Sequence, residues 1–321
     1  MPPAKTPKIL SKGPWYLTMI VSASYRTDIP AFYSNWFRNR LEAGFCRVVN
    51  PYGGPVQNIA LTPAAVAGFV FWTRNPGPFR AALREVARRG IPFAVQVTAT
   101  GYPRALEASV LPPERSVALV GEIHRRYGPR ATVWRYDPVL ITSAMTPAWH
   151  RRNFAALARQ FAGKTDEVVF SFAQIYAKTR SNLNRAAQRH GLAWNDPPDE
   201  DKRALLAELA AIARELGLKP TLCAQPNLMG ADLEPASCID AERLSDIAGR
   251  PIAARVKGTR PGCLCAESRD IGAYDSCPHG CTYCYAVRRP ELAKRNHRSH
   301  DPESAFLIAP KTGGAGNVAG Y

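Results

Sequence analysis

Gly68-Phe-Val-Phe-Trp-Thr73 and Phe93-Ala-Val-Gln-Val-Thr98 enclose a helical segment, residues 78–89, which ends at Gly90. Both apolar runs are short, continuous and rich in β-branched and aromatic residues, which is typical of strands buried on both faces. A proline near the start and a glycine just past the end are typical of a helix. The stretch therefore predicts a strand, a helix and a second strand.

The same pattern repeats along most of the chain. We expect strands at residues 16–23, 68–73, 93–98, 132–136, 168–172 and 220–224. We expect a first helix between its cap Asp28 and Gly44, and further helices at residues 78–89, 113–127, 147–162, 198–216 and 241–247. Six repeats of strand and helix predict an α/β fold with a parallel sheet and right-handed crossovers. A partial (β/α)6 TIM-like barrel fits this rhythm, and an open doubly wound parallel sheet is the alternative.

The sequence divides into four parts. Residues 1–14 are expected to be a flexible segment, and residues 15–255 a barrel-like domain. A turn-rich stretch interrupts that domain and predicts an inserted hairpin near residues 45–61. Residues 256–300 form a cysteine-rich module that we expect to bind an iron–sulfur cluster, and residues 301–321 are expected to be a tail.

Composition and charge limit the function. The 321 residues are 46% hydrophobic and 21% charged, without an apolar leader or a run long enough to cross a bilayer. We therefore expect a cytoplasmic protein with no membrane partner, whose reduced thiols serve as metal ligands. The formal net charge of +16 suits a nucleic acid or nucleotide substrate. Arginine enrichment by a GC-rich genome would produce the same excess.

Candidate metal ligands are most concentrated in Cys277-Pro-His-Gly-Cys281-Thr-Tyr-Cys284. Three cysteines at this spacing can bring their sulfurs to one point, as iron–sulfur and zinc ligands do. For zinc, the Cys281 and Cys284 pair could combine with Cys263 and Cys265 into a four-thiolate site.

The other cysteines need a separate account. Cys223, Cys238, Cys263 and Cys265 could together hold a second iron–sulfur cluster or another metal. Cys223 and Cys238 could equally be small buried apolar residues, as free cysteines commonly are. Cys46, in the predicted hairpin, is expected to be structural.

Polar residues follow the predicted strands, where active sites of parallel α/β scaffolds collect. The candidates for catalysis are Arg26, Asp28, Arg74, Arg135 and Asp137. Arginines in three separate loops could grip a carboxylate or phosphate with paired hydrogen bonds. Asp28 could also cap a helix.

The cysteine motif, with Tyr283 before its last cysteine, resembles the signature of the radical S-adenosylmethionine (SAM) superfamily. The resemblance implies a [4Fe–4S] cluster held by Cys277, Cys281 and Cys284, with SAM on the remaining iron. It also implies that Tyr283 lies beside the adenine of SAM, and that a reductant protein such as a flavodoxin or ferredoxin supplies the electron. The motif is similar to that of the spore photoproduct lyase branch. In other radical SAM proteins, however, the cysteine loop follows the first strand, whereas here it follows the sixth.

Over residues 18–308 the chain resembles a bacterial family known as a domain of unknown function. The resemblance is carried by five stretches: Ser22-Ala-Ser-Tyr-Arg-Thr-Asp-Ile-Pro-Ala-Phe-Tyr33, Phe71-Trp-Thr-Arg-Asn-Pro76, Thr98-Ala-Thr-Gly-Tyr102, Trp134-Arg-Tyr-Asp-Pro138 and Asp270-Ile-Gly-Ala-Tyr274. The resemblance implies no reaction of its own.

The expected function is therefore reductive cleavage of SAM to a 5′-deoxyadenosyl radical, which acts on an unknown, anionic or nucleic-acid-derived substrate. One alternative is a basic nucleic-acid-binding protein stabilised by zinc. Another is an iron–sulfur protein that transfers electrons or acts as a sensor.

Overall fold

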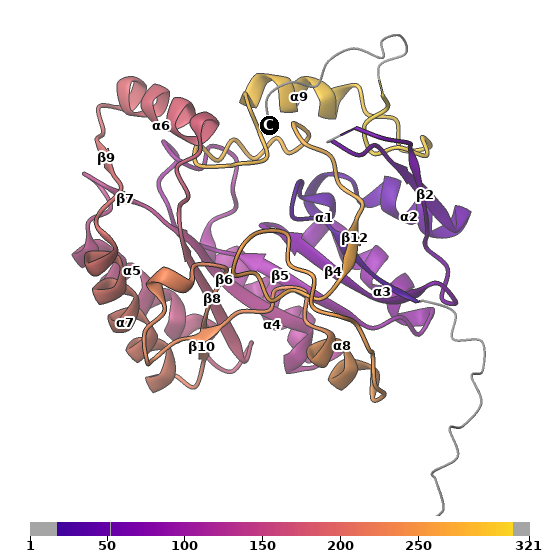
Figure 1. Cartoon of the computed structure of the whole chain (residues 1–321), viewed down its shortest axis with the longest axis horizontal. Coiled ribbons are helices and arrows are strands. Elements are labelled where there is room, and N and C mark those ends of the chain that lie inside the picture. The colour runs from indigo at the N-terminus through magenta and orange to yellow at the C-terminus, as the bar shows by residue number, and fades with distance from the viewer. Residues whose placement is uncertain (1–17, 52, 311–321) are drawn as a thin grey trace, which may run out of the picture.

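The apolar runs of the sequence form the strands of one eight-stranded sheet, in which every neighbouring pair is parallel (Figure 1). The structure, a computed structural model, describes residues 18–51 and 53–310. In sheet order the strands are β11 (Glu234–Pro235), β10 (Lys219–Leu222), β8 (Glu167–Phe172), β6 (Thr132–Val139), β5 (Phe93–Thr98), β4 (Val66–Thr73), β1 (Met19–Ala23) and β12 (Ser268–Asp270).

This architecture confirms the predicted α/β class and its large parallel sheet. The order rises along the chain from β1 to β11 without reversal, and β12 returns to lie beside β1. Within the described part of the chain, the hydrogen-bonded sheet ends at β11 on one side and at β12 on the other. The sheet is therefore open, which fits the alternative expectation of an open parallel sheet; a closed TIM barrel is not shown.

Nine helices accompany the sheet in the described residues. They are α1 (Ile29–Phe32), α2 (Ser34–Ala43), α3 (Arg80–Arg88), α4 (Pro113–Tyr127), α5 (Pro147–Phe161), α6 (Ala177–His190), α7 (Asp199–Glu215), α8 (Ala241–Ala248) and α9 (Pro290–Arg298). Short 3-10 turns are η1 (Gly77–Phe79), η2 (Pro129–Ala131) and η3 (Pro226–Leu228). None of the helices described is long and apolar enough to cross a membrane.

Two antiparallel pairs lie outside the main sheet. β2 (Phe45–Val48) and β3 (Gln57–Ala60) pair as a hairpin within the stretch expected to hold one. β7 (Ile141–Thr142) pairs with β9 (Trp194–Asn195). The expected flexible segment, residues 1–14, and the tail beyond residue 310 lie outside the described residues.

The two faces of the sheet are covered differently. Side chains alternate along β4, so Phe69 and Phe71 belong to the large apolar core while Val70 belongs to a smaller one. The large core includes buried side chains of α2, α3, α4, α5 and α7. In the smaller core, the strands pack against α8 and four cysteines. The segment that follows α8 crosses this second face (Figure 1).

Helix α8 packs tightly on the sheet. A Cβ atom on Gly68 of β4 would lie 3.0 Å from Leu244 Cδ1, so the absence of a side chain allows the helix to approach. Arg243 of α8 is fully buried and pairs with Asp166 and Glu167 at 2.9 and 2.7 Å.

The start of α8 gives a stability prediction. The Asp240 carboxylate caps the helix by accepting hydrogen bonds from the backbone N–H groups of Glu242 and Arg243, at 2.9 and 3.1 Å. Asp240→Ala is expected to lower the free energy of unfolding by about 1 kcal/mol, measured by urea titration. Asp240→Asn, which can cap equally well, is the control and should lose much less. Equal losses in the two variants would contradict the capping role.

Candidate metal and cofactor site

A cavity of about 790 Å³ lies at the carboxyl ends of the strands. Its walls contain residues that follow or end β1, β4, β5, β6, β8 and β10, as expected for a site on a parallel α/β scaffold. Its volume is within the range of cavities that bind small molecules and cofactors. Every site residue proposed from the sequence lines it: Arg26, Asp28, Arg74, Arg135, Asp137, Cys223, Cys238, Cys263, Cys265, Cys277, Cys281, Tyr283 and Cys284.

Cys277, Cys281 and Cys284, the first cysteine set, lie in an irregular loop between β12 and α9. Backbone hydrogen bonds dock this loop on the segment after β5: Ser109 N–H donates to His279 O, and Thr282 N–H donates to Leu106 O, both at 2.9 Å. The loop therefore reaches the cavity although it is remote in sequence from the first strand.

The His279 side chain fixes the same loop from inside. Its Nε2 lies 2.8 Å from Asp28 Oδ2, and its Nδ1 lies 3.1 Å from the carbonyl oxygen of Ser109. Asp28 also accepts hydrogen bonds from the N–H groups of Ala31 and Arg74, at 2.9 and 2.7 Å. Asp28 thus joins the start of α1, the end of β4 and the cysteine loop, which is a positioning role.

Two buried side chains, Arg74 and Glu107, hold Tyr283 in place. Arg74 Nη1 lies 2.9 Å from Glu107 Oε1, and the Tyr283 hydroxyl hydrogen-bonds with both residues. Burial opposes the charge on Arg74, but Glu107 and Tyr283 raise the pKa of its guanidinium well above the usual value. Glu107 was not predicted as a site residue, because a single acidic residue in a loop belongs to no motif.

The thiols of the first cysteine set are partly exposed toward the cavity and otherwise surrounded by protein. Burial raises the pKa of Cys281 to about 12 and the pKa of Cys284 above its usual value. Burial, Asp28 and the other two cysteines raise the pKa of Cys277 well above that of a free thiol. Without metal these thiols hold their protons, and a metal would have to displace them.

The remaining candidate arginines are also paired with carboxylates. Arg26 Nε lies 2.9 Å from Asp270 Oδ1, and Asp270 accepts further hydrogen bonds from Ser22 and Ser24. Arg135 Nε donates to Asp137 Oδ2 at 2.9 Å. Because Arg26, Arg74 and Arg135 each have a carboxylate partner, most of their charge is balanced within the protein.

Cys223, Cys238, Cys263 and Cys265, the second cysteine set, are brought together from three segments. The sulfurs of Cys223 and Cys238 are 3.4 Å apart, and the Cys265 thiol interacts with those of Cys238 and Cys263. Among the described residues, no group of three or more His, Cys, Asp or Glu is arranged so that it could hold a metal ion. Pairwise interactions link Cys223 to Cys238, Cys238 to Cys265 and Cys265 to Cys263.

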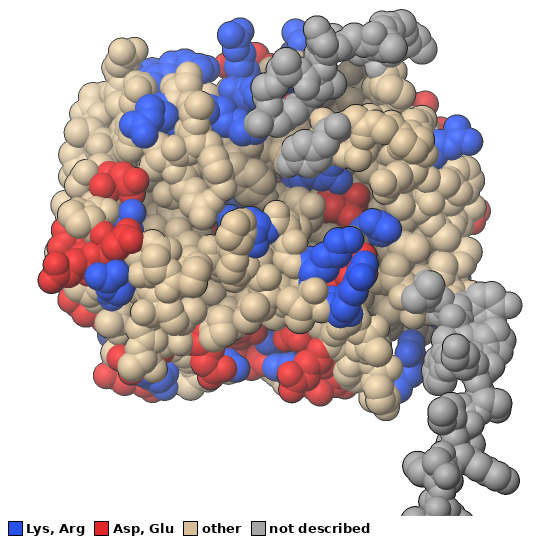
Figure 2. All heavy atoms as spheres, in the orientation of Figure 1, with Lys and Arg blue, Asp and Glu red and all other residues tan. Residues whose placement is uncertain are grey.

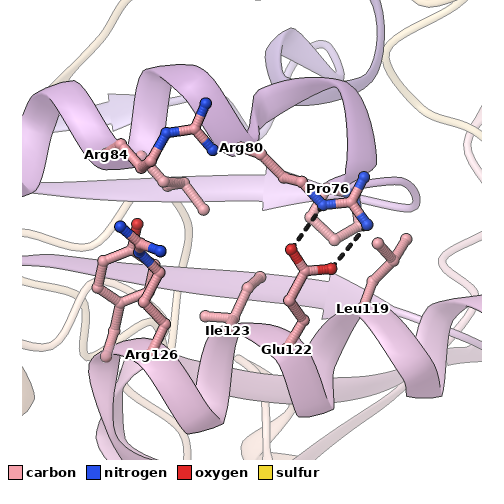
Figure 3. Close-up of a pocket in the computed structure, with 9 residues that line it drawn as sticks. Pro76, Arg80, Arg84, Leu119, Glu122, Ile123 and Arg126 are labelled. Atoms are coloured by element: carbon pink, nitrogen blue, oxygen red, sulfur yellow. Dashed lines mark hydrogen bonds and ion pairs between the residues drawn. The ribbon is translucent and has the colours of Figure 1, made fainter.

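A second pocket, of about 40 Å³, lies between α3 and α4 and shares no lining residue with the cavity at the strand ends (Figure 3). Arg80 and Glu122 bridge its edge through two hydrogen bonds of 2.7 and 2.6 Å. Its lining contains no cysteine. This pocket is too small for a cofactor and takes no part in the site.

Charge is unevenly spread over the face of the molecule shown in Figure 2. Acidic side chains gather along the left and lower edges, whereas basic ones lie over the upper part and near the middle. Lys178 and Arg269 line the cavity, where they add positive charge.

A family model described as "Domain of unknown function (DUF1848)" matches residues 20–286. The chain belongs to this family. The match covers the sheet, the cavity and both cysteine sets, but the family description names no activity.

Two further comparisons add no function. No curated protein matches the chain. Among solved structures, one from work on the inhibition of the pneumococcal virulence factor StrH, and on N-glycan recognition and hydrolysis, matches at 12% identity with a TM-score of 0.23. The match covers 65% of this chain and 53% of that one, about half its length. Likeness at this level carries no argument about the DUF1848 chain.

Proposed function

We propose that this DUF1848 protein is a radical SAM-type iron–sulfur enzyme. The observation that carries the proposal is that Cys277, Cys281 and Cys284 all face one cavity at the carboxyl ends of the parallel strands. A loop at the far end of the chain thus supplies three thiols where α/β enzymes collect their active-site residues.

The residues present fit a [4Fe–4S] cluster. Three thiols leave one iron without a protein ligand, and the cavity beside them leaves room for a second cofactor. The backbone N–H of Ala286 lies 3.4 Å from Cys284 Sγ and can donate to that sulfur, as N–H groups around iron–sulfur clusters do. A cubane spreads its thiolates over separate irons, so its ligands need not converge on one point as those of a single ion must.

When bound, the cluster and SAM would supply reductive cleavage of the sulfonium bond, which yields methionine and a 5′-deoxyadenosyl radical that abstracts hydrogen from the substrate. The protein would contribute orientation and shelter from water. Tyr283, fixed by Arg74 and Glu107, would form part of the wall against which the nucleoside of SAM packs. His279 and Asp28 would hold the cysteine loop still.

The consecutive order of β1, β4, β5, β6, β8 and β10 supports a six-unit partial barrel as the framework of this site. Lys178 and Arg269 in the cavity, together with the net charge of +16, favour an anionic or nucleic-acid-derived substrate. A small reductant protein such as a flavodoxin or ferredoxin would provide the electron, and the cytoplasm would suit such an exchange.

The test is reconstitution of the purified protein with iron and sulfide in the absence of air. After addition of dithionite and SAM, we expect release of 5′-deoxyadenosine, measured by liquid chromatography. Samples without dithionite are the control. A fully loaded [4Fe–4S] preparation that reduces but leaves SAM intact would rule out radical chemistry and favour electron transfer or sensing. Zinc in place of iron at Cys277, Cys281 and Cys284 would favour a nucleic-acid-binding protein.

A further inference from the structure

The second cysteine set belongs to the smaller core, on the face of the sheet that α8 covers. Cys223 directly follows β10, Cys238 follows β11 by three residues, and Cys263 and Cys265 lie in the irregular segment between α8 and β12. Cys223, Cys238 and Cys265 are 7%, 3% and 6% exposed, while Cys263 is partly exposed. Thiols from chain segments that are far apart in the sequence thus lie close together.

Two guanidinium groups are directed at these sulfurs. Arg135 Nη1 donates to Cys238 Sγ at 3.0 Å, and Arg260 Nη2 donates to Cys223 Sγ at 3.4 Å. A neutral thiol is a weak hydrogen-bond acceptor, whereas a metal-bound thiolate is anionic and accepts strongly. Arg260 Nη1 also donates to Gln174 Oε1 at 3.4 Å, and the Asp137 carboxylate favours the charge of its guanidinium. An anionic sulfur at Cys223 would add a directly bonded partner for that charge.

Backbone groups complete this second layer. The N–H of Ile239 donates to Cys265 Sγ at 3.3 Å, and Cys263 interacts with the backbone at Cys265 and Thr259. Groups that donate to ligand atoms in this way orient ligands and tune metal sites. The segment that carries Cys263 is tightly folded, since a Cβ on Gly258 would lie 2.2 Å from Cys263 O.

The spacing of the sulfurs distinguishes between metals. With bonds of about 2.3 Å, a tetrahedral zinc ion holds its thiolates roughly 4 Å apart, close to the 3.4 Å between Cys223 and Cys238. A cubane would need them much farther apart. We propose that Cys223, Cys238, Cys263 and Cys265 bind one zinc ion, which ties the segment between α8 and β12 to the ends of β10 and β11.

Binding requires the four sulfurs to surround one ion. Cys263 is the least buried of the four thiols, so the least packing opposes a change of its side-chain position. Thiol sites of this kind commonly take their final geometry as the metal displaces the thiol protons. The proposal is independent of the iron–sulfur site, since the two cysteine sets share no residue.

The test measures zinc by mass spectrometry in full-length protein. We expect one zinc ion per chain in the wild type and in the triple variant Cys277→Ala, Cys281→Ala, Cys284→Ala, and loss of that zinc in Cys238→Ala and Cys265→Ala. Cys46→Ala, which removes a buried cysteine outside both sets, should keep its zinc. Zinc that persists in Cys238→Ala and Cys265→Ala, or that leaves with the first set, would overturn the proposal, as would iron and sulfide at the second set.

A second measurement does not depend on whether those variants fold. Zinc is removed from the wild type and from the triple variant with a chelator and replaced by cobalt. Both proteins should then develop the intense visible absorption of a tetrahedral cobalt ion. The sulfur-to-cobalt charge-transfer band should be as intense as four thiolate ligands produce. The weak visible spectrum of octahedral cobalt would contradict the proposed site. A charge-transfer band only as intense as two thiolate ligands produce would contradict it as well.

Discussion

Cys281→Ala is expected to prevent assembly of the iron–sulfur cluster and to lower 5′-deoxyadenosine release more than about 100-fold. Loss of a residue that merely orients a metal ligand costs 10- to 100-fold in affinity or activity, so loss of the ligand itself should cost more. Cys281 is held in the cavity wall by the docked loop, and its neighbour Thr282 bonds to Leu106 through the backbone.

The measurement combines iron and sulfide content, visible absorption and the SAM-cleavage assay on one anaerobic sample. Cys46→Ala serves as the matched control, because Cys46 is fully buried in β2 and does not line the cavity. The control should keep its cluster and its activity. The proposed function fails if Cys281→Ala retains both, or if wild-type protein with a full cluster never cleaves SAM.

Much of the fold was predictable because its signals are local. Each of the six strand predictions overlaps a strand of the parallel sheet, since buried parallel strands are continuous apolar runs. The helices α3, α4, α5 and α7 were marked by proline at their start or glycine after their end. These features depend on a few neighbouring residues, so sequence alone carries them.

The elements that were missed lack such signals. Helix α6 is rich in Lys, Arg, Asn and Ser, and it buries few residues, among them Leu183 and Ala186. Strand β12 is Ser268–Asp270, without an apolar run, and its place beside β1 results from parallel pairing with a strand almost 250 residues earlier. Pairing over such a distance is a property of the whole fold.

The residues that line the site could be predicted from the sequence, but the ion pairs between them could not. The cysteine spacing and the residues at strand ends identified the lining of the cavity. The carboxylates that neutralise Arg26 and Arg74, Asp270 and Glu107, were not identified as such, because neither lies in a loop that follows the same strand as its arginine. Which carboxylate pairs with which arginine depends on how distant parts of the chain pack together in the folded protein.

Glu107→Ala is expected to lower the free energy of unfolding by about 3–5 kcal/mol. The Arg74 and Glu107 side chains are 10% and 3% exposed, and removal of one partner leaves the other charge buried and unpaired. The Tyr283 and Thr100 hydroxyls would lose their acceptor as well. Urea titration of the metal-free protein measures the loss.

The double variant Arg74→Met, Glu107→Leu separates the missing charge from the missing contact. Replacement of a buried ion pair by apolar residues of similar volume is often close to neutral. The double variant should therefore recover most of the stability that Glu107→Ala loses. If both proteins are destabilised equally, the cost arises from packing or from the Tyr283 hydroxyl rather than from the unpaired guanidinium.

Glu107→Gln tests what the pair does for the cluster. The amide keeps an acceptor for the Tyr283 hydroxyl, but it removes the negative charge that balances Arg74 beside Cys281. Net charge around an iron–sulfur cluster is one of the factors that set its reduction potential, and added positive charge favours the reduced form. We therefore expect Glu107→Gln to raise the midpoint potential, measured by anaerobic redox titration. Glu85→Gln changes a partly exposed carboxylate of α3 that does not line the cavity, and it should leave the potential unchanged. An unchanged potential in Glu107→Gln would mean that the Arg74 and Glu107 pair holds Tyr283 in place without acting on the cluster.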